Sequence, residues 1–412
     1  MKRNRLVFLL VFFLALGTIG VLYVLNGNRN QQTIAVDIEN DIPGATVSNS
    51  VYTKDPVGNS TVVQPVITPS SHPQAKAVKI VAVGDILLGR GVESRLKKDN
   101  KDYIYPFAKV ADILKQGDIV FANLEEPITS RTHSLTGIKQ GGKYVLKNEV
   151  DAIKGLEYAG FNLFSLANNH ILDYYEEGLY DTQAILKEHG MAYSGAGKNT
   201  EEAKKPAIIE KNGVKVGLLS YTDMAEVTYK GNPPLMFIAG ENKAGVAKRP
   251  IKFDDTIKSE VEKLRKEVDI LMVSLHWGFE ESFEIWDSQV EFAHKLMDNG
   301  VDVILGHHAH QFQGIELYKG KPIFYSLGNF IFDQNDPENQ EAFIMNMEFV
   351  DNKLVSMEGI PVRTIDKSQV VPQKGEKAKN ILEREVALCK ELNTKCEINE
   401  DKLIFDLGSV TR

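Results

Sequence analysis

Cysteine is scarce in this chain of 412 residues, which contains only Cys389 and Cys396. Two cysteines cannot form a tetrathiolate zinc site or a framework of several disulfides, so neither organises the fold. The chain also lacks an excess of basic residues, because its formal net charge is −8. Proteins that bind nucleic acid usually carry a basic footprint, and we therefore exclude nucleic acid as a partner.

The N-terminus contains one long uncharged run, from Leu6 to Leu25, preceded by the basic sequence "MKRNR". About 20 apolar residues suffice for a helix to cross a bilayer. The run is longer than that of a cleaved signal peptide, and no small-residue cleavage site follows it. We therefore expect residues 1–25 to form a cytoplasmic basic tip and an uncleaved transmembrane signal anchor. The basic cluster predicts a single-pass protein of the cell membrane, with a cytoplasmic N-terminus and the following domain outside.

Residues 26–76 are rich in Asn, Thr, Ser, Val and Pro and show no sustained period. This composition predicts a disordered extracytoplasmic stalk. From residue 77 onward, short apolar runs such as "VKIVAVGDI", "DILMVSLH" and "VDVILGH" alternate with helical patterns such as "DSQVEFAHKLMDNG". Such runs are typical of strands buried on both faces, and the alternation predicts an α/β domain with a largely parallel core sheet.

The pattern changes from residue 342 onward. The stretch "AFIMNMEFVDNKLVSMEGIPVRTID" alternates apolar and polar residues around "DNK", which predicts a β-hairpin. A helical pattern and a short strand pattern follow it. We therefore assign residues 77–365 to the main domain and residues 366–412 to a C-terminal helix-strand extension.

Polar side chains cluster where the predicted strands end. They are Asp85, Asn123, Glu125, Asn168, Asn169, His170, His276, His307, His308 and His310. Because parallel sheets bind ligands at the carboxyl ends of their strands, we expect these groups to converge on one rim. Most of them have an ordinary alternative as turn residues, but the clustered imidazoles of "GHHAH" do not. His133, His189 and His294 fall in predicted loops or on helix surfaces and are interpreted as solvated.

This combination of groups is typical of divalent metal binding. Imidazole suits Zn, Fe, Mn or Ni, whereas carboxylate and amide oxygens suit harder ions. A bound metal with an open position lowers the pKa of its water, and two adjacent ions can hold both oxygens of a displaced phosphoryl group. The residues therefore indicate a metal centre suited to phosphoester hydrolysis.

The ordered motifs "GDILLGRGVE", "NLEEPIT", "LANNHILDY", "HWGFE", "GHHAHQFQGIE" and "YSLGNFIFDQ" span about residues 78–334. In this series the chain resembles the CapA-type poly-γ-glutamate capsule biosynthesis family, whose domain is similar to calcineurin-like metallophosphoesterases. The resemblance implies a metallophosphatase-like sandwich of two mixed β-sheets flanked by helices. It also implies a bacterial, membrane-anchored protein that takes part in making or exporting poly-γ-glutamate. The implied partners are the membrane, this anionic polymer and other capsule synthesis and export membrane proteins.

The resemblance also implies residue roles. One or two divalent ions (Mn, Fe or Zn) would be held by Asp85, Glu125, Asn169, His276, His308 and His310. His170 would lie near the leaving oxygen and act in catalysis with Asp85 and Arg90. Substrate would contact Arg90, Asn123, His307 and Asn329.

Two positions depart from the family pattern. Leu87 stands where the first motif usually has a histidine, and Glu125 stands where an aspartate usually bridges two ions. One metal position therefore loses a ligand, which leaves a mononuclear site or a non-hydrolytic site open. Two functions follow: a polymer-handling component of the capsule machinery, or a metal-dependent hydrolase of a phosphoester or γ-glutamyl polymer.

The two cysteines lie near the end of the chain, on either side of the turn sequence "ELNTK". Such a turn can bring Cys389 and Cys396 within the Cα separation that a disulfide needs. Outside the membrane the compartment is oxidising. We therefore expect a disulfide between them, with a pair of free thiols as the alternative.

Overall fold

The computed structural model of the chain describes residues 20–22, 35–37, 75–229 and 231–408. It divides into two units, residues 1–74 and residues 75–412. In the first unit, strand β1 (Gly20–Leu22) pairs antiparallel with β2 (Ala35–Asp37). The sequence predicted a membrane-crossing helix over β1 and a stalk over β2. The structure describes these two three-residue segments as strands.

The remainder of the predicted anchor and stalk lies outside the described residues. Among the residues that the structure does describe, no helix combines the length and apolar character needed to cross a membrane. The anchor and its orientation therefore stay predictions.

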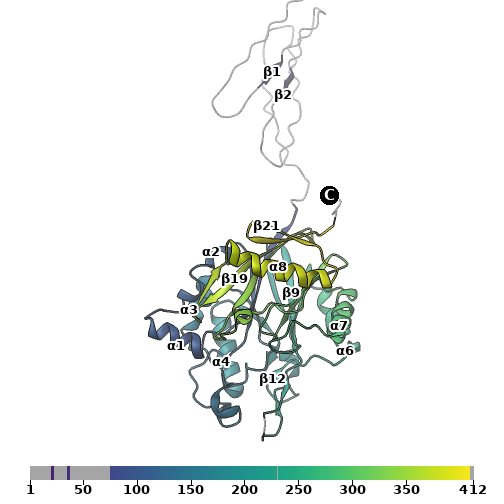
Figure 1. Ribbon diagram of the computed structural model, residues 1–412. Coiled ribbons are helices and arrows are strands. Elements are labelled where there is room, and N and C mark those ends of the chain that lie inside the picture. Colours follow the sequence, from purple (N-terminus) through teal and green to yellow (C-terminus); the bar gives the residue numbers. More distant parts are fainter. Residues whose placement is uncertain (1–19, 23–34, 38–74, 230, 409–412) are drawn as a thin grey trace, which may run out of the picture. The chain divides into compact units, whose positions relative to one another are not determined.

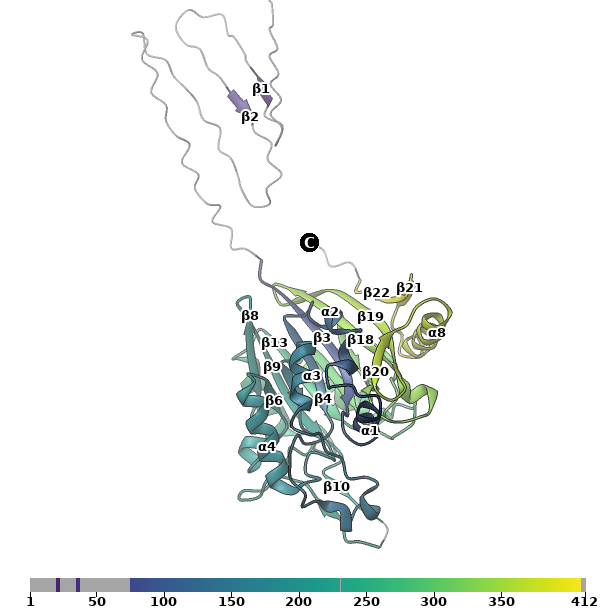
Figure 2. The same cartoon turned by 90° about the vertical axis from the view of Figure 1, so that its left-hand side faces the viewer.

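The second unit contains a ten-stranded mixed sheet (Figure 2). Its central path runs in the order β21 (Cys396–Asn399), β22 (Lys402–Phe405), β19 (Lys353–Ile365), β18 (Glu341–Val350), β3 (Ala77–Ile86), β4 (Ile119–Leu124), β5 (Leu163–Ser165) and β6 (Ala192–Ser194). Two strands branch from it, β17 (Asn329–Ile331) beside β3 and β20 (Gln369–Pro372) beside β19. The strands from β3 to β6 are parallel, whereas β18, β19, β20, β21 and β22 pair antiparallel.

A second mixed sheet has six strands, in the order β15 (Ile315–Tyr318), β16 (Lys321–Phe324), β14 (Val303–His307), β13 (Ile270–His276), β9 (Val214–Thr222) and β8 (Ala207–Lys211). Its four inner strands are parallel and its two edge strands antiparallel. Two short pairs complete the strands of this unit, β7 (Ala196–Gly197) with β12 (Gly245–Val246) and β10 (Glu226–Val227) with β11 (Leu235–Met236).

The helices are α1 (Arg90–Lys98), α2 (Ala111–Leu114), α3 (Ala152–Ala159), α4 (Tyr175–Glu188), α5 (Thr200–Ala203), α6 (Asp255–Arg265), α7 (Asp287–Asp298) and α8 (Glu376–Glu391), with 3-10 turns η1 (Tyr105–Phe107), η2 (Leu135–Gly137), η3 (Gln140–Gly142) and η4 (Pro337–Gln340). α1 and α3 lie on one side of the unit and α6 and α7 on the other (Figure 1). Helices therefore flank both sheets.

The core follows the two-residue period of the strands. On β13, Met272 packs in the cluster shared by both sheets, whereas its neighbour Val273 packs with residues of α6 and α7. On β4, Phe121 joins the shared cluster and Val120 packs with residues of α1 and α3. Alternate side chains of a strand point to opposite faces of its sheet. The two sheets therefore enclose one apolar core between them. Two further apolar cores lie between the outer face of each sheet and the helices that cover it.

This arrangement corrects the single, largely parallel sheet that the alternating pattern alone predicted. Apolar runs identify strands but do not assign them to one sheet or another. It agrees with the mixed sheets and flanking helices that the family resemblance implied. The predicted β-hairpin is confirmed as β18 and β19, and its turn residues Asp351 and Asn352 have φ of 47° and 65°, the conformation that tight hairpin turns require.

The predicted C-terminal extension consists of α8, β21 and β22, and β22 joins the large sheet by pairing with β19. Both cysteines are free thiols in this structure. The buried Cys389 thiol donates to Glu385 Oε1 at 3.1 Å. A hydrogen bond with Cys396, together with burial, raises the pKa of Cys389. The two thiols are therefore neighbours, and the disulfide between them stays a prediction.

Candidate metal-binding site

Strands of both sheets end at the same place. His276 is the last residue of β13 and lies opposite His307, the last residue of β14. On the other sheet, Asp85 of β3 lies opposite Asn123 of β4, and Glu125 follows β4 directly. The convergence at the strand ends agrees with the expectation from the sequence.

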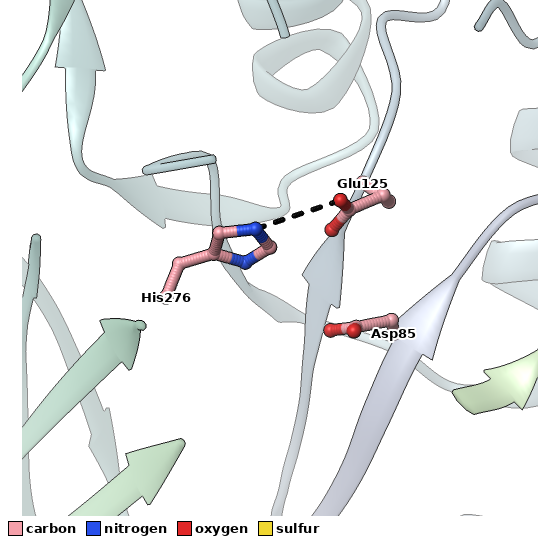
Figure 3. Close-up of side chains that lie close together, drawn as sticks. All are labelled: Asp85, Glu125 and His276. Atoms are coloured by element: carbon pink, nitrogen blue, oxygen red, sulfur yellow. Dashed lines mark ion pairs between the residues drawn. The ribbon is translucent and has the colours of Figure 1, made fainter. Parts of the chain in front are cut away.

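Three of these side chains form the centre of the site. Asp85, Glu125 and His276 point toward one another (Figure 3), and one ligand atom from each lies within 4.8 Å of the others. All three are fully buried. His276 Nε2 is 3.6 Å from Glu125 Oε1. Burying two neighbouring carboxylates is unfavourable unless a cation or hydrogen bonds compensate.

The two carboxyls differ in their protonation. Burial and then the charge of Asp85 raise the pKa of Glu125 well above its usual value. Burial also opposes ionisation of Asp85, but its hydrogen bond with His307 and the nearby imidazoles hold the pKa of Asp85 below its usual value. One carboxylate is thus already compensated by imidazoles, whereas the other still lacks a cation.

Several buried polar atoms at this place have no hydrogen-bond partner within the part of the chain that the structure describes. They are Glu125 Oε1, His276 Nδ1, His307 Nε2 and His308 Nδ1. Buried polar atoms are nearly always satisfied, so a group of them indicates a bound ion or ordered water. The oxygen and nitrogen donors of Asp85, Glu125 and His276 therefore fit a divalent cation.

Asn169 belongs to the same centre. Its Oδ1 accepts a hydrogen bond from His276 Nε2 at 2.9 Å, so two predicted ligand atoms face each other. Asn123, predicted to bind substrate, is fully buried, and its Nδ2 donates to Asp85 at 2.8 Å and to Glu125. An amide nitrogen has two hydrogens, and both are used. Asn123 therefore holds the two carboxylates in place instead of facing a substrate.

Histidines surround this centre. His307 was predicted to bind substrate, but it is fully buried and its Nδ1 donates to Asp85 Oδ1 at 2.9 Å. The ring of His308 lies 4.7 Å from that of His276. Burial, and next the neighbouring His310, lower the pKa of His308 to about 3. His308 is therefore a neutral imidazole at pH 7, the form that binds metals.

His310 lies one step farther out, with its Nδ1 3.9 Å from Asp85 Oδ2. The same Nδ1 donates to Asn329 Oδ1 at 2.8 Å, so Asn329 orients this histidine, although it was predicted to bind substrate. His308 and His310 have φ of 89° and 59°. Non-glycine residues rarely adopt this conformation, and such residues cluster at functional sites.

His170 forms a separate buried pair with Asp173. Its Nδ1 donates to Asp173 Oδ2 at 2.9 Å. Burial, and then the charge of Lys139, lower the pKa of His170 to about 4. A neutral His170 therefore keeps an unprotonated Nε2. Asp173 was not among the predicted residues, although its position three residues after His170 in "NNHILD" was a usable signal.

Arg90, predicted to contact an anionic substrate, forms a two-point ion pair with Asp333, in which Nε donates to Oδ2 at 2.7 Å. Its guanidinium lies over the Phe332 ring at 5.7 Å, and that ring is 4.8 Å from His310. The side chain stays 34% exposed, which leaves room for a ligand. The pairing of Arg90 with Asp333 was not predictable from the sequence, because 243 positions separate the two residues.

Leu87 has its side chain fully buried in the core cluster beside α1. At the position where the family resemblance implied a histidine, the Leu87 side chain packs in the core and supplies no metal ligand. Of the other histidines, His133 stacks on Tyr175 at 4.4 Å, whereas His294 bonds Glu316 at 2.8 Å and is half-buried, not solvated as predicted.

Known proteins with related sequences agree with this arrangement of motifs. Residues 79–334 match the family described as bacterial capsule synthesis protein PGA_cap. The chain belongs to this family. It is 32% identical over 327 residues to the PGA biosynthesis protein CapA of Bacillus subtilis, covering 79% of this chain and 81% of that protein. It is 30% identical over 302 residues to the capsule biosynthesis protein CapA of Bacillus anthracis, covering 72% and 70%.

A more distant relative comes from Mycobacterium tuberculosis, where a probable polyglutamine synthesis accessory protein is 27% identical over 338 residues. The match covers 69% of this chain and 84% of that protein. All of the predicted ligands lie inside the matched range 79–334, whereas α8, β21 and β22 lie beyond it.

Proposed function

We propose that this protein is a membrane-anchored, extracytoplasmic component of poly-γ-glutamate capsule synthesis or export, with a metallophosphatase-like domain that holds a divalent cation. The observation that carries the proposal is the buried set of Asp85, Glu125 and His276, in which the Glu125 carboxylate still lacks a compensating cation. Its relatives in Bacillus are named as a PGA biosynthesis protein and a capsule biosynthesis protein, which supports poly-γ-glutamate as the polymer. The partners are the anionic polymer, the membrane and other capsule synthesis and export proteins.

The cation, Mn, Fe or Zn, would bind Asp85, Glu125 and His276, with Asn169 Oδ1 beside His276. It would supply positive charge for an anionic group and acidify a bound water. His308 and His310 border the same space and would complete one ion or contribute to a second.

The chain's own residues support polymer binding as the main role. Arg90 offers a partly exposed guanidinium fixed by Asp333, and Arg recognises carboxylates through such a fixed fork. Leu87 supplies no ligand for a second metal, which favours a site that holds the polymer without cutting it.

A metal-dependent hydrolase is the second candidate, and one observation favours it. His170 is buried, neutral and oriented by Asp173, so its Nε2 is prepared to exchange a proton with a bound group. In this case the substrate would be a phosphoester or the γ-glutamyl polymer itself.

The decisive experiment measures metal content in the purified full-length chain and in the variants His308→Ala, His310→Ala and Asp85→Asn. We expect bound transition metal in the unaltered protein and an affinity at least about 10-fold lower in each variant, because each removes a predicted ligand. His294→Ala, which changes a histidine outside the site, is the matched control. A metal content that is the same in the unaltered chain and in the three site variants would refute the proposed site.

Incubating the metal-loaded chain with bis-p-nitrophenyl phosphate and with poly-γ-glutamate then separates the two functions. Polymer binding without cleavage of either compound supports the handling role. Cleavage that disappears in His170→Gln supports the hydrolase.

A further inference from the structure

A buried lysine lies beside the candidate site, outside the set of predicted ligands. Lys139 lies between η2 and η3, and its side chain is 0% exposed. Its Nζ donates to the backbone oxygen of Asn169 at 3.0 Å and forms an ion pair with Asp173, which is 0% exposed as well. Lysine is rarely buried completely unless it is paired.

Asp173 joins two parts of the molecule. Its Oδ2 accepts hydrogen bonds from His170 Nδ1 at 2.9 Å and from the backbone nitrogen of Leu146 at 2.7 Å. Its backbone oxygen accepts one from the nitrogen of Leu135 at 2.9 Å. Residues 134–147, which we call the docking segment, are therefore attached to the same residue that orients His170, and Lys139 lies in the middle of this segment.

A second segment covers the ammonium of Lys139. The rings of Tyr229 and Phe237 lie 5.7 Å and 5.2 Å from Nζ. They come from the region of the β10–β11 pair, which is distant in sequence from the docking segment. Aromatic faces attract a desolvated cation. Three separate segments thus meet at one ammonium group.

We propose that Lys139 is a positioning residue, which fixes the turn of Asn169 and His170 and docks the segment 134–147 over that turn. An ion pair that served only stability would involve Asp173 alone, and an apolar pair of similar volume is often equally stable. Lys139 also bonds the backbone of Asn169, whose side chain lies 2.9 Å from His276 Nε2. The part of this inference that concerns metal rests on the proposed function.

Docking is tested first on the metal-free, full-length chain by hydrogen exchange. The variant Lys139→Met removes the ammonium, and Lys143→Met removes an exposed lysine of the same segment as a matched control. We expect the amides of Leu135 and Leu146 to exchange at least about 10-fold faster in Lys139→Met and at the unaltered rate in the control. Unchanged exchange in Lys139→Met would overturn the docking.

Positioning is tested by the affinity for Mn²⁺ alone. The double variant Lys139→Met with Asp173→Asn removes both charges but keeps an oxygen acceptor for His170. We expect the Tm of this double variant to be close to that of the unaltered chain, because neither charge is left buried without its partner. We expect Mn²⁺ to bind the double variant at least about 10-fold more weakly, because Asn169 has lost its restraint. Full Mn²⁺ affinity in the double variant would reduce Lys139 to a structural ion pair and overturn the positioning.

These outcomes are distinguishable from failure of the proposed function. If the unaltered chain binds none of Mn²⁺, Fe²⁺ and Zn²⁺, the proposed metal centre is refuted, and with it the positioning of Asn169 for metal. The exchange experiment needs no metal and decides the docking by itself.

Discussion

At the scale of the residue, Leu87 shows what the departure from the family pattern means physically. It is fully buried among apolar side chains. We predict that Leu87→His does not add a metal ligand and lowers the free energy of unfolding by at least about 2 kcal/mol, because it buries an imidazole in an apolar core. Leu87→Met, which conserves volume, should cost less than about 1.5 kcal/mol. Urea denaturation with a parallel metal assay checks both variants; extra bound metal in Leu87→His would contradict the prediction.

A second prediction at this scale follows from the lowered pKa of His308. It is lowered from 6.5 to about 3 in the folded chain, so between these values the unfolded chain binds more protons than the folded one. Stability from this group is complete above pH 6.5 and is lost as the pH falls toward 3. The metal-free unaltered chain should therefore lose about 1.4 kcal/mol per pH unit more than His308→Ala in this window. Equal slopes in urea titrations at pH 4, 5 and 6 would contradict this.

The residues that sequence reasoning found and missed differ in one respect. Asp85 and Glu125 lie at the ends of neighbouring parallel strands of the large sheet, so their meeting was predictable. His276 ends a strand of the six-stranded sheet, and it joins them because strands of both sheets end at the same place. Asp333 and Lys139 have no such signal. Their partners, Arg90 and Asp173, are 243 and 34 positions away. Only the path of the intervening loops brings them together, and loop paths are not encoded by a local period.

At the scale of the element, strands were easier to predict than sheets. The alternating run after Ala342 correctly predicted β18 and β19, because both the period and the turn are local. The division of the parallel strands between two sheets was not predictable. β9, β13 and β14 are as apolar as β3, β4 and β5, and each set is buried on both faces.

One prediction at the scale of the element concerns the two cysteines, which lie near the end of α8 and at the start of β21. Cys389 and Cys396 are neighbouring thiols here, and Cys389 donates to the buried Glu385. We predict that protein recovered from outside the cytoplasmic membrane contains the disulfide, because that compartment is oxidising. Mass spectrometry after alkylation without reduction checks it. Two alkyl groups per chain would contradict the prediction, and Cys396→Ser provides the control with one.

At the scale of the whole molecule, the prediction concerns sidedness. From the basic residues before the apolar run, we predict that the domain beyond Lys76 lies outside the membrane. Protease added to intact cells stripped of their wall should release a soluble fragment that contains the domain. Complete protection of the fragment, with cleavage only after lysis, would reverse the predicted orientation.

The separation of the site residues along the chain also determines at what stage of folding the candidate site can form. Asp85 and His307, which are hydrogen-bonded, are 222 positions apart, and the strands that carry them belong to different sheets. Contacts between such distant positions form late in folding, because a long loop must close first. A nascent or translocating chain therefore has no preformed site for a cation. The proposed cation would therefore be taken up in the compartment where the chain finishes folding, and its identity would record where that happened.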